Sequence, residues 1–178
     1  MALAKIATTF LAAGIPTIVG MQEVENIGIL EDLAAWDSFA VYDYQPVLVE
    51  GTGSRGIDVD YLVRGDHVEI LDVQQHIAPE GLTSRPPLLV KVEIGTSRGD
   101  ITLYALNNHF SSLAGGEAAT EPRRTVQAAW NVTVTGLNPC GGSRCLHLCN
   151  GRPKYLSGHP ANSDPEGGRL RTHLRCLA

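Results

Sequence analysis

The sequence predicts an α/β domain in which mostly antiparallel strands are flanked by helices. Apolar residues recur at helical spacing near both ends of the first 138 residues, and between those ends they alternate or form short runs. Glycine and proline separate consecutive strands closely enough for hairpins. The 178 residues are 43% hydrophobic and 19% charged, so they can fill the core of one domain. No apolar run reaches about 18 residues, so no transmembrane segment is expected.

The first third of the chain predicts a helix, a buried strand and a second helix. Residues 1–13 end at Gly14 and present one apolar face, made of Leu3, Ile6, Ala7, Phe10 and Leu11. This stretch lacks the charged start and long apolar core of a secretory signal, so it is interpreted as an internal helix. Residues 15–20 form a short apolar run that indicates a buried strand. Acidic and apolar residues over 29–35 then indicate a short helix.

Four strands and a helix are expected next. The strands are predicted over residues 58–64, 67–73, 88–94 and 101–106. Val59, Tyr61 and Val63 share one face of the first of them. Gly65-Asp66 and Arg98-Gly99-Asp100 form turns, and Ser84-Arg85-Pro86-Pro87 forms a rigid break. Residues 121–135 predict a helix with Pro122 in its first turn and with an apolar face of Val126, Ala129, Trp130 and Val134.

Two polar segments follow predicted strands and contain candidate catalytic groups. Glu23 follows the first strand, where a rigidly held and exposed carboxylate suits a hard cation such as Mg²⁺. Asn108 and His109 follow the 101–106 strand, and an imidazole beside amides and hydroxyls can bind phosphate oxygens or donate a proton. Each has a structural alternative, because acids also stabilise a helix N-terminus and histidine is common in polar loops.

A third candidate is the glycine-rich segment 51–58. Its glycines permit close backbone approach, and Arg55 offers a fork of donors for phosphate. The segment lacks the strand before and the helix after that define a P-loop, so a nucleotide cradle is not expected. The segment can therefore be either a loop without a functional role or a loop that binds substrate.

The last 40 residues differ from the rest in composition. Residues 1–138 hold 17 acidic and 8 basic residues, a net charge of −9, whereas residues 139–178 hold 2 acidic and 6 basic residues, a net charge of +4. The later segment contains no Val, Ile, Phe, Trp or Met, and it holds every cysteine of the chain. Its candidate metal ligands match no closed zinc-finger spacing well; they are Cys140, Cys145, His147, Cys149 and Cys176.

Five segments in order resemble the endonuclease/exonuclease/phosphatase superfamily, which has the deoxyribonuclease-I-like fold. They lie at residues 18–26, 54–64, 84–88, 106–112 and 121–130, so the resemblance covers about residues 1–138. Bacterial, often secreted, nuclease-like members are the most similar. The resemblance implies an incomplete four-layered α/β sandwich with mostly antiparallel sheets. It gives no localisation for this chain and no protein partner.

The resemblance also implies hydrolysis of a phosphodiester or phosphomonoester by a metal-activated water, with nucleic acid or another phosphoester as substrate. Glu23 matches the metal-binding glutamate of the family, for Mg²⁺ or alternatively Mn²⁺ or Ca²⁺. His109 matches the imidazole that contacts the scissile phosphate, and Asn108 is expected to orient it. Arg55 and Asp58 match a segment assigned to substrate binding. The arginines at 123 and 124 are expected to pack or pair on their helix.

Several polar positions of the family site have no match here, so the chain is expected to be inactive as written. Both termini of the family domain are expected to be missing, the C-terminal part through a shifted reading frame after about residue 138. Starting each codon one base later from Cys149, permitted codons read Val-Met-Gly-Asp-Leu-Asn, which contains the missing Gly-Asp-x-Asn motif of the family. Residues 139–178 are therefore expected to be poorly ordered, and the chain marginally stable.

Two other functions remain as alternatives. The same fold can serve as a non-catalytic binding module that keeps the surface loops and not the chemistry. The cysteine-rich tail can instead make the chain a zinc-binding interaction protein, with the tail translated in its own frame.

Overall fold

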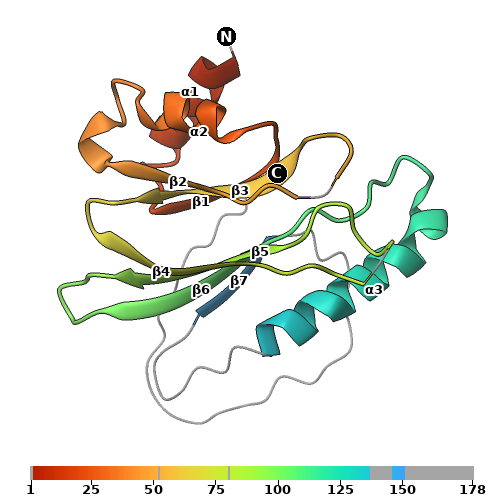
Figure 1. Ribbon diagram of the computed structural model, residues 1–178. Coiled ribbons are helices and arrows are strands. Elements are labelled where there is room, and N and C mark those ends of the chain that lie inside the picture. The colour runs from red at the N-terminus through yellow and green to blue at the C-terminus, as the bar shows by residue number, and fades with distance from the viewer. Residues whose placement is uncertain (1, 52, 80, 137–145, 151–178) are drawn as a thin grey trace.

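The protein folds into four layers, in the order helices, sheet, sheet, helix (Figure 1). The computed structural model describes residues 2–51, 53–79, 81–136 and 146–150. The first sheet has the strand order β1-β3-β2, from β1 (Ile18–Val24), β2 (Tyr44–Leu48) and β3 (Asp58–Arg64). The second has the order β4-β5-β6-β7, from β4 (Val68–Gln75), β5 (Leu88–Ile94), β6 (Ile101–Asn107) and β7 (Leu146–Asn150).

The helices cover the two outer faces of this sandwich. α1 (Ala2–Ala12) and α2 (Ile27–Ala34) lie over the first sheet, a short 3-10 helix (Ala40–Tyr42) precedes β2, and α3 (Glu117–Gly136) lies on the second sheet (Figure 1). All strand pairs are antiparallel except β6 with β7. The predicted α/β class with mostly antiparallel sheets flanked by helices is therefore confirmed.

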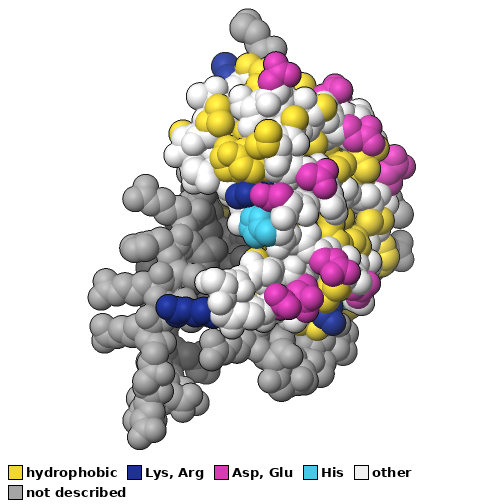
Figure 2. All heavy atoms as spheres, turned by 90° about the vertical axis from the view of Figure 1, so that its left-hand side faces the viewer, with side chains coloured by type: hydrophobic (Ala, Val, Ile, Leu, Met, Phe, Trp, Pro, Cys, Tyr) yellow, Lys and Arg dark blue, Asp and Glu magenta, His cyan; other side chains and the backbone are white. Residues whose placement is uncertain are grey.

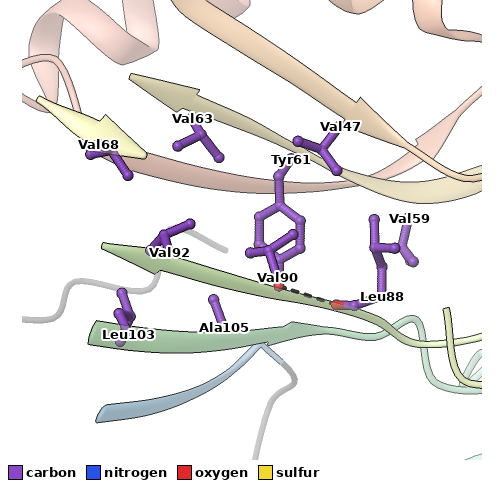
Figure 3. Packing of buried hydrophobic residues seen from close by; sticks show 10 residues of the cluster. All are labelled: Val47, Val59, Tyr61, Val63, Val68, Leu88, Val90, Val92, Leu103 and Ala105. Atoms are coloured by element: carbon purple, nitrogen blue, oxygen red, sulfur yellow. Dashed lines mark hydrogen bonds between the residues drawn. The ribbon is translucent and has the colours of Figure 1, made fainter. Parts of the chain in front are cut away.

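The main core fills the space between the sheets. Alternate residues of β3 point into it, because side chains of a strand alternate between its faces. Figure 3 shows these side chains meeting those of β4, β5 and β6; the ten residues are Val47, Val59, Tyr61, Val63, Val68, Leu88, Val90, Val92, Leu103 and Ala105. The Tyr61 hydroxyl donates a hydrogen bond to the Leu88 carbonyl at 3.4 Å, so the one polar atom of this tyrosine ring has a partner inside the core.

A second core lies between the first sheet and its helices. Phe10 of α1 stacks on Phe39 with ring centroids 5.5 Å apart, and Tyr44 packs edge-on against Phe39 at 5.8 Å. Leu62, on the face of β3 opposite Tyr61, is fully buried in the same cluster. β3 is thus buried on both faces, as is typical of a central strand covered by two layers.

Two predicted elements extend beyond their expected bounds, and one observed strand was not predicted. β1 extends to Val24, since its residues beyond Gly20 pair with β3, so Glu23 lies within the strand and not after it. β2 is the strand that was not predicted, and its Pro46 is tolerated because β2 is an edge strand. α3 starts at Glu117, because Glu-Ala-Ala are strong helix formers, and Pro122 therefore lies inside the helix and not in its first turn.

The segment predicted to be poorly ordered contributes β7. This strand runs parallel to β6 and pairs Asn150 with Asn107. The remainder of 139–178, with Cys140, Cys145 and Cys176, lies outside the described residues, so the order and origin of this segment remain predictions. Within the described ranges, no helix has both the length and the hydropathy needed to cross a bilayer.

Candidate active site

The predicted site residues come from one end of the sandwich. In the first sheet Val24 pairs with Asp58, and in the second Leu88 pairs with Asn107. The end of β1, the start of β3, the start of β5 and the end of β6 therefore share this end. It receives Glu23 from β1, Asp58 from β3, and Asn108 and His109 from the segment after β6. Long-range topology thus joins residues 86 positions apart.

A β-bulge in β1 displays Glu23. Gln22 pairs with Val59 and Val24 with Asp58, so Glu23 is left without a partner position on β3. Its backbone has φ +62°, in the left-handed region that non-glycine residues rarely adopt. Such a conformation costs on the order of 1–3 kcal/mol and is concentrated at functional sites. The bulge turns the carboxylate outward, where its side chain is 56% exposed.

His109 faces Glu23 across the gap between the two sheets. Its Nε2 lies 3.8 Å from Oε1 of Glu23, whereas its side chain is only 17% exposed. Burial lowers the pKa of His109, the charge of Arg85 lowers it further, Glu23 raises it, and Arg55 adds a smaller lowering effect. The imidazole is therefore neutral at pH 7, and it can either accept a hydrogen bond or donate one.

Two asparagines hold this end of the sandwich together. The side-chain amide of Asn107 donates hydrogen bonds to the carbonyls of Met21, at 2.7 Å, and Asp60, at 2.9 Å, which joins β6 to the first sheet. Gln22 donates to the Asn108 carbonyl at 2.7 Å. Asn108 is buried, and its side-chain oxygen accepts from Asn131 of α3. Asn108 thus anchors the segment that carries His109, and its predicted direct role in orienting the imidazole remains a prediction.

Arg55 belongs to the loop between β2 and β3, and Asp58 is the first residue of β3. Asp58 is buried, and its Oδ1 accepts a hydrogen bond of 3.0 Å from the Gly51 amide. A Cβ at Gly51 would lie 2.5 Å from the same oxygen, so only glycine fits there. The carboxylate therefore closes the loop. Arg55 lines a small hollow together with Gly53, Ser54, Ile57, Ser84 and Arg85.

Arg85 is the site residue that the sequence analysis did not identify. Its Nε and Nη1 atoms are buried and have no hydrogen-bond partner among the described residues. Arg85 lines the hollow with Arg55 and also a neighbouring one with His109, Asn108, Gln127 and Asn131. In the sequence its only signal is a rigid Ser-Arg-Pro-Pro break directly before a buried strand. Unsatisfied guanidinium donors that face two hollows suit an anion.

Charged side chains also lie at the end of the sheets opposite the candidate site. Figure 2 shows the opposite end of the sheets, where acidic side chains are spread over the described part of the face. There Asp66 accepts hydrogen bonds from Arg64 and contacts His67, so the charges of Asp66 and Arg64 balance one another. The described residues contain no group of three or more His, Cys, Asp and Glu side chains that could hold a metal ion. Within these residues Glu23 is therefore not part of such a group.

The electrostatic arrangement makes opposite predictions for two substitutions. Arg85→Gln should raise the pKa of His109, because a nearby positive charge is removed, and Glu23→Gln should lower it further, because a negative charge is removed. Burial remains in both variants, so neither should restore the ordinary value. NMR titration of the His109 ring protons measures both shifts. Shifts of the same sign in the two variants would contradict this arrangement.

Comparisons with known proteins agree with this fold. The Endonuclease/Exonuclease/phosphatase family profile matches residues 1–135. No curated protein sequence matches the chain. Among solved structures, Danio rerio TDP2 in complex with a single-stranded DNA product is 20% identical, with a TM-score of 0.55, and the match covers 77% of this chain and 48% of that one.

Two further solved structures share the fold. Truncated Caenorhabditis elegans TDP2 is 16% identical with a TM-score of 0.59, covering 89% of this chain and 58% of that one. The endonuclease/exonuclease/phosphatase from Bacteroides vulgatus is 18% identical with a TM-score of 0.51, covering 74% and 51%. The chain thus spans about half the length of these structures. Since the family profile matches most of the sequence, the chain belongs to the endonuclease/exonuclease/phosphatase family.

Proposed function

We propose that the chain carries part of the active site of a metal-dependent phosphoester hydrolase related to bacterial extracellular nucleases. The observation that carries this proposal is the approach of Glu23 and His109 from different sheets, 3.8 Å apart, beside the unsatisfied guanidinium of Arg85. A carboxylate next to a neutral imidazole, with a cation that lines the same hollow as the imidazole, is a set of groups that can bind and polarise a phosphoester.

Each group then has one role. Glu23 would hold a divalent cation, Mg²⁺ or alternatively Mn²⁺ or Ca²⁺, since Mg²⁺ is commonly bound by one or two carboxylates together with waters and substrate phosphates. When bound, such a cation activates water and neutralises phosphate charge. His109 would donate a hydrogen bond to a phosphate oxygen, and Arg55 and Arg85 would bind the same anion. Asp58 would hold the Arg55 loop in place.

We propose that the chain is inactive as written, because several polar positions of the family site have no match in the sequence. The shifted-frame reading of the tail accounts for the missing groups. β7 pairs Asn150 with Asn107, and the shifted Gly-Asp-Leu-Asn would follow Asn150 in the sequence. The nucleotide sequence tests this origin. If removing or adding one base near codon 139 opens no longer frame encoding Gly-Asp-Leu-Asn, the tail is translated in its own frame.

The function itself is tested by ligand binding and by turnover. We expect the full chain to bind inorganic phosphate more tightly with Mg²⁺ present, and Glu23→Ala should remove that enhancement. Asp32→Ala, at an exposed position on α2, is the matched control. Hydrolysis of a model phosphodiester should be at background level. Magnesium-dependent hydrolysis that is lost in Glu23→Ala and His109→Ala would show that the site is complete, whereas phosphate binding unaffected by Glu23→Ala would favour the non-catalytic binding module.

A further inference from the structure

One polar stripe of α3 contacts both loops of the candidate site. Arg123, Gln127 and Asn131 are spaced by four residues, so they lie on one face of the helix. Asn131 donates to the Asn108 side chain, and Arg123 donates to the Gly81 carbonyl at 2.8 Å. This polar stripe therefore contacts both the segment after β6 and the loop before β5.

Gln127 is the central residue of this stripe. Its Oε1 accepts a hydrogen bond from the Ser111 amide at 3.0 Å. Its Nε2 donates to the Leu82 carbonyl at 2.7 Å and contacts the Ser111 hydroxyl at 3.1 Å. The residue is 5% exposed, and buried hydrogen bonds of this kind constrain the groups that they join. Ser111 lies two positions after His109, and Leu82 lies three positions before Arg85.

These contacts require the chemistry of a glutamine. The Ser111 amide is a donor and the Leu82 carbonyl is an acceptor, so the bridging side chain must accept on one atom and donate from another. Anchoring of α3 does not need this residue, because Val134 and Trp130 already pack with Leu89 and Leu106 of the sheet beneath. The bridge connects two loops that have no strand pairing with each other, and both of them line the hollow shared by Arg85 and His109.

We propose that Gln127 is a positioning residue that holds the Arg85 loop and the His109 segment at the separation needed to bind one phosphate group between them. The identity of the anion rests on the proposed function; the positioning itself does not. Arg123 and Asn131 support the same two segments from either side of Gln127. The substrate group would thus be held by β-sheet loops whose spacing is set by a helix on the outer face.

The test compares two α3 variants of the full chain. Gln127→Met keeps the side-chain length and removes every hydrogen bond of the bridge, whereas Val134→Ala removes buried packing from the same helix without touching either loop. The first readout is the Nε–Hε NMR signal of Arg85, assigned by its loss in Arg85→Gln. It should shift and exchange faster with water in Gln127→Met and stay unchanged in Val134→Ala. An unchanged signal in Gln127→Met, or equal changes in both variants, would overturn the proposal.

The second readout is the affinity for inorganic phosphate. We expect Gln127→Met to weaken binding about tenfold, equivalent to about 1.4 kcal/mol, and Val134→Ala to change it less than twofold. In an Arg85→Gln background Gln127→Met should have little further effect, because Gln127 acts through Arg85. Additive losses would refute that coupling. If the wild-type chain binds no phosphate while the Arg85 signal still responds only to Gln127→Met, the positioning stands and the anion-binding part of the proposed function fails.

Discussion

Asp60→Asn should make the protein more stable than the wild type at pH 8 and remove a large pH dependence of folding. Asp60 is fully buried, and neither of its carboxylate oxygens has a partner among the described residues. Burial raises its pKa from 3.8 to about 7, with a smaller contribution from Asp58. A shift of about 3 units corresponds to about 4 kcal/mol of stability, which is a large fraction of what a small domain has.

The sign of this pH dependence follows from the raised pKa of Asp60 in the folded protein. Below pH 3.8 the carboxyl is protonated in both the folded and the unfolded chain, so it adds no pH dependence. Between pH 3.8 and 7 only the unfolded chain releases this proton, and the free energy of unfolding falls as the pH rises. Above pH 7 the carboxylate is charged in the folded protein too, and the full free-energy cost of burying that charge lowers the stability. Asparagine does not titrate, so the free energy of unfolding of the variant, relative to that of the wild type, should rise steadily from pH 3.8 to pH 7.

Urea unfolding of the wild type and of Asp60→Asn at intervals between pH 4 and pH 8 measures the difference in their free energies of unfolding. The pH dependence contributed by all other titrating groups is the same in both proteins, so it cancels in the comparison. These groups include His76 and His109, whose pKa values are lowered by burial and which therefore make the folded state less stable as the pH falls. Asp32→Asn, at an exposed position on α2, serves as the control and should run parallel to the wild type. A constant difference between Asp60→Asn and the wild type over the whole range would exclude a raised pKa at Asp60.

Asp60 also shows where the sequence pattern was informative and where it was not. The alternation of Val59, Tyr61 and Val63 correctly predicted β3 and the face that meets the second sheet. On the opposite face only Leu62 is apolar, and Asp58, Asp60 and Arg64 fit a half-exposed strand, so the pattern did not predict that Asp60 is buried. Only the packing of helices over the first sheet turns Asp60 from an ordinary exposed acid into a buried one.

The candidate site was predictable in part for a similar reason. Glu23 and His109 were identified because each follows or ends an apolar run, which is a local signal. Their proximity depends on strand order, and the bulge that displays Glu23 depends on pairing with β3, so neither could be derived from local patterns. Arg85 has only the Ser-Arg-Pro-Pro break as a local signal, and no local pattern indicated a role for Gln127. Their roles come from hydrogen bonds, or from the lack of them, between segments that only the fold brings together.

Asn107→Ala should destabilise the protein by about 2–4 kcal/mol and also separate the two halves of the site. The side chain is fully buried, and its amide joins the Met21 and Asp60 carbonyls across the two sheets. Leaving buried carbonyls without a partner costs about 1–3 kcal/mol each. Gly20 permits this contact, because a Cβ there would come within 3.2 Å of the Asn107 amide. Thermal and urea unfolding measure the loss of stability.

Stability and site geometry can be separated with Phe39→Ala. This substitution removes a fully buried ring from the core beneath α1, far from the sheet end that holds the site, and should cost about 3–5 kcal/mol. The informative quantity is the change in His109 pKa caused by Glu23→Gln, measured in each background at a temperature where both remain folded. We expect that change to persist in Phe39→Ala and to shrink in Asn107→Ala. Unlike Phe39, Asn107 joins β6, which leads to His109, to the Met21 carbonyl two residues before Glu23. A response that is equally reduced in both backgrounds would mean that overall stability, and not the Asn107 bridge, holds the two residues together.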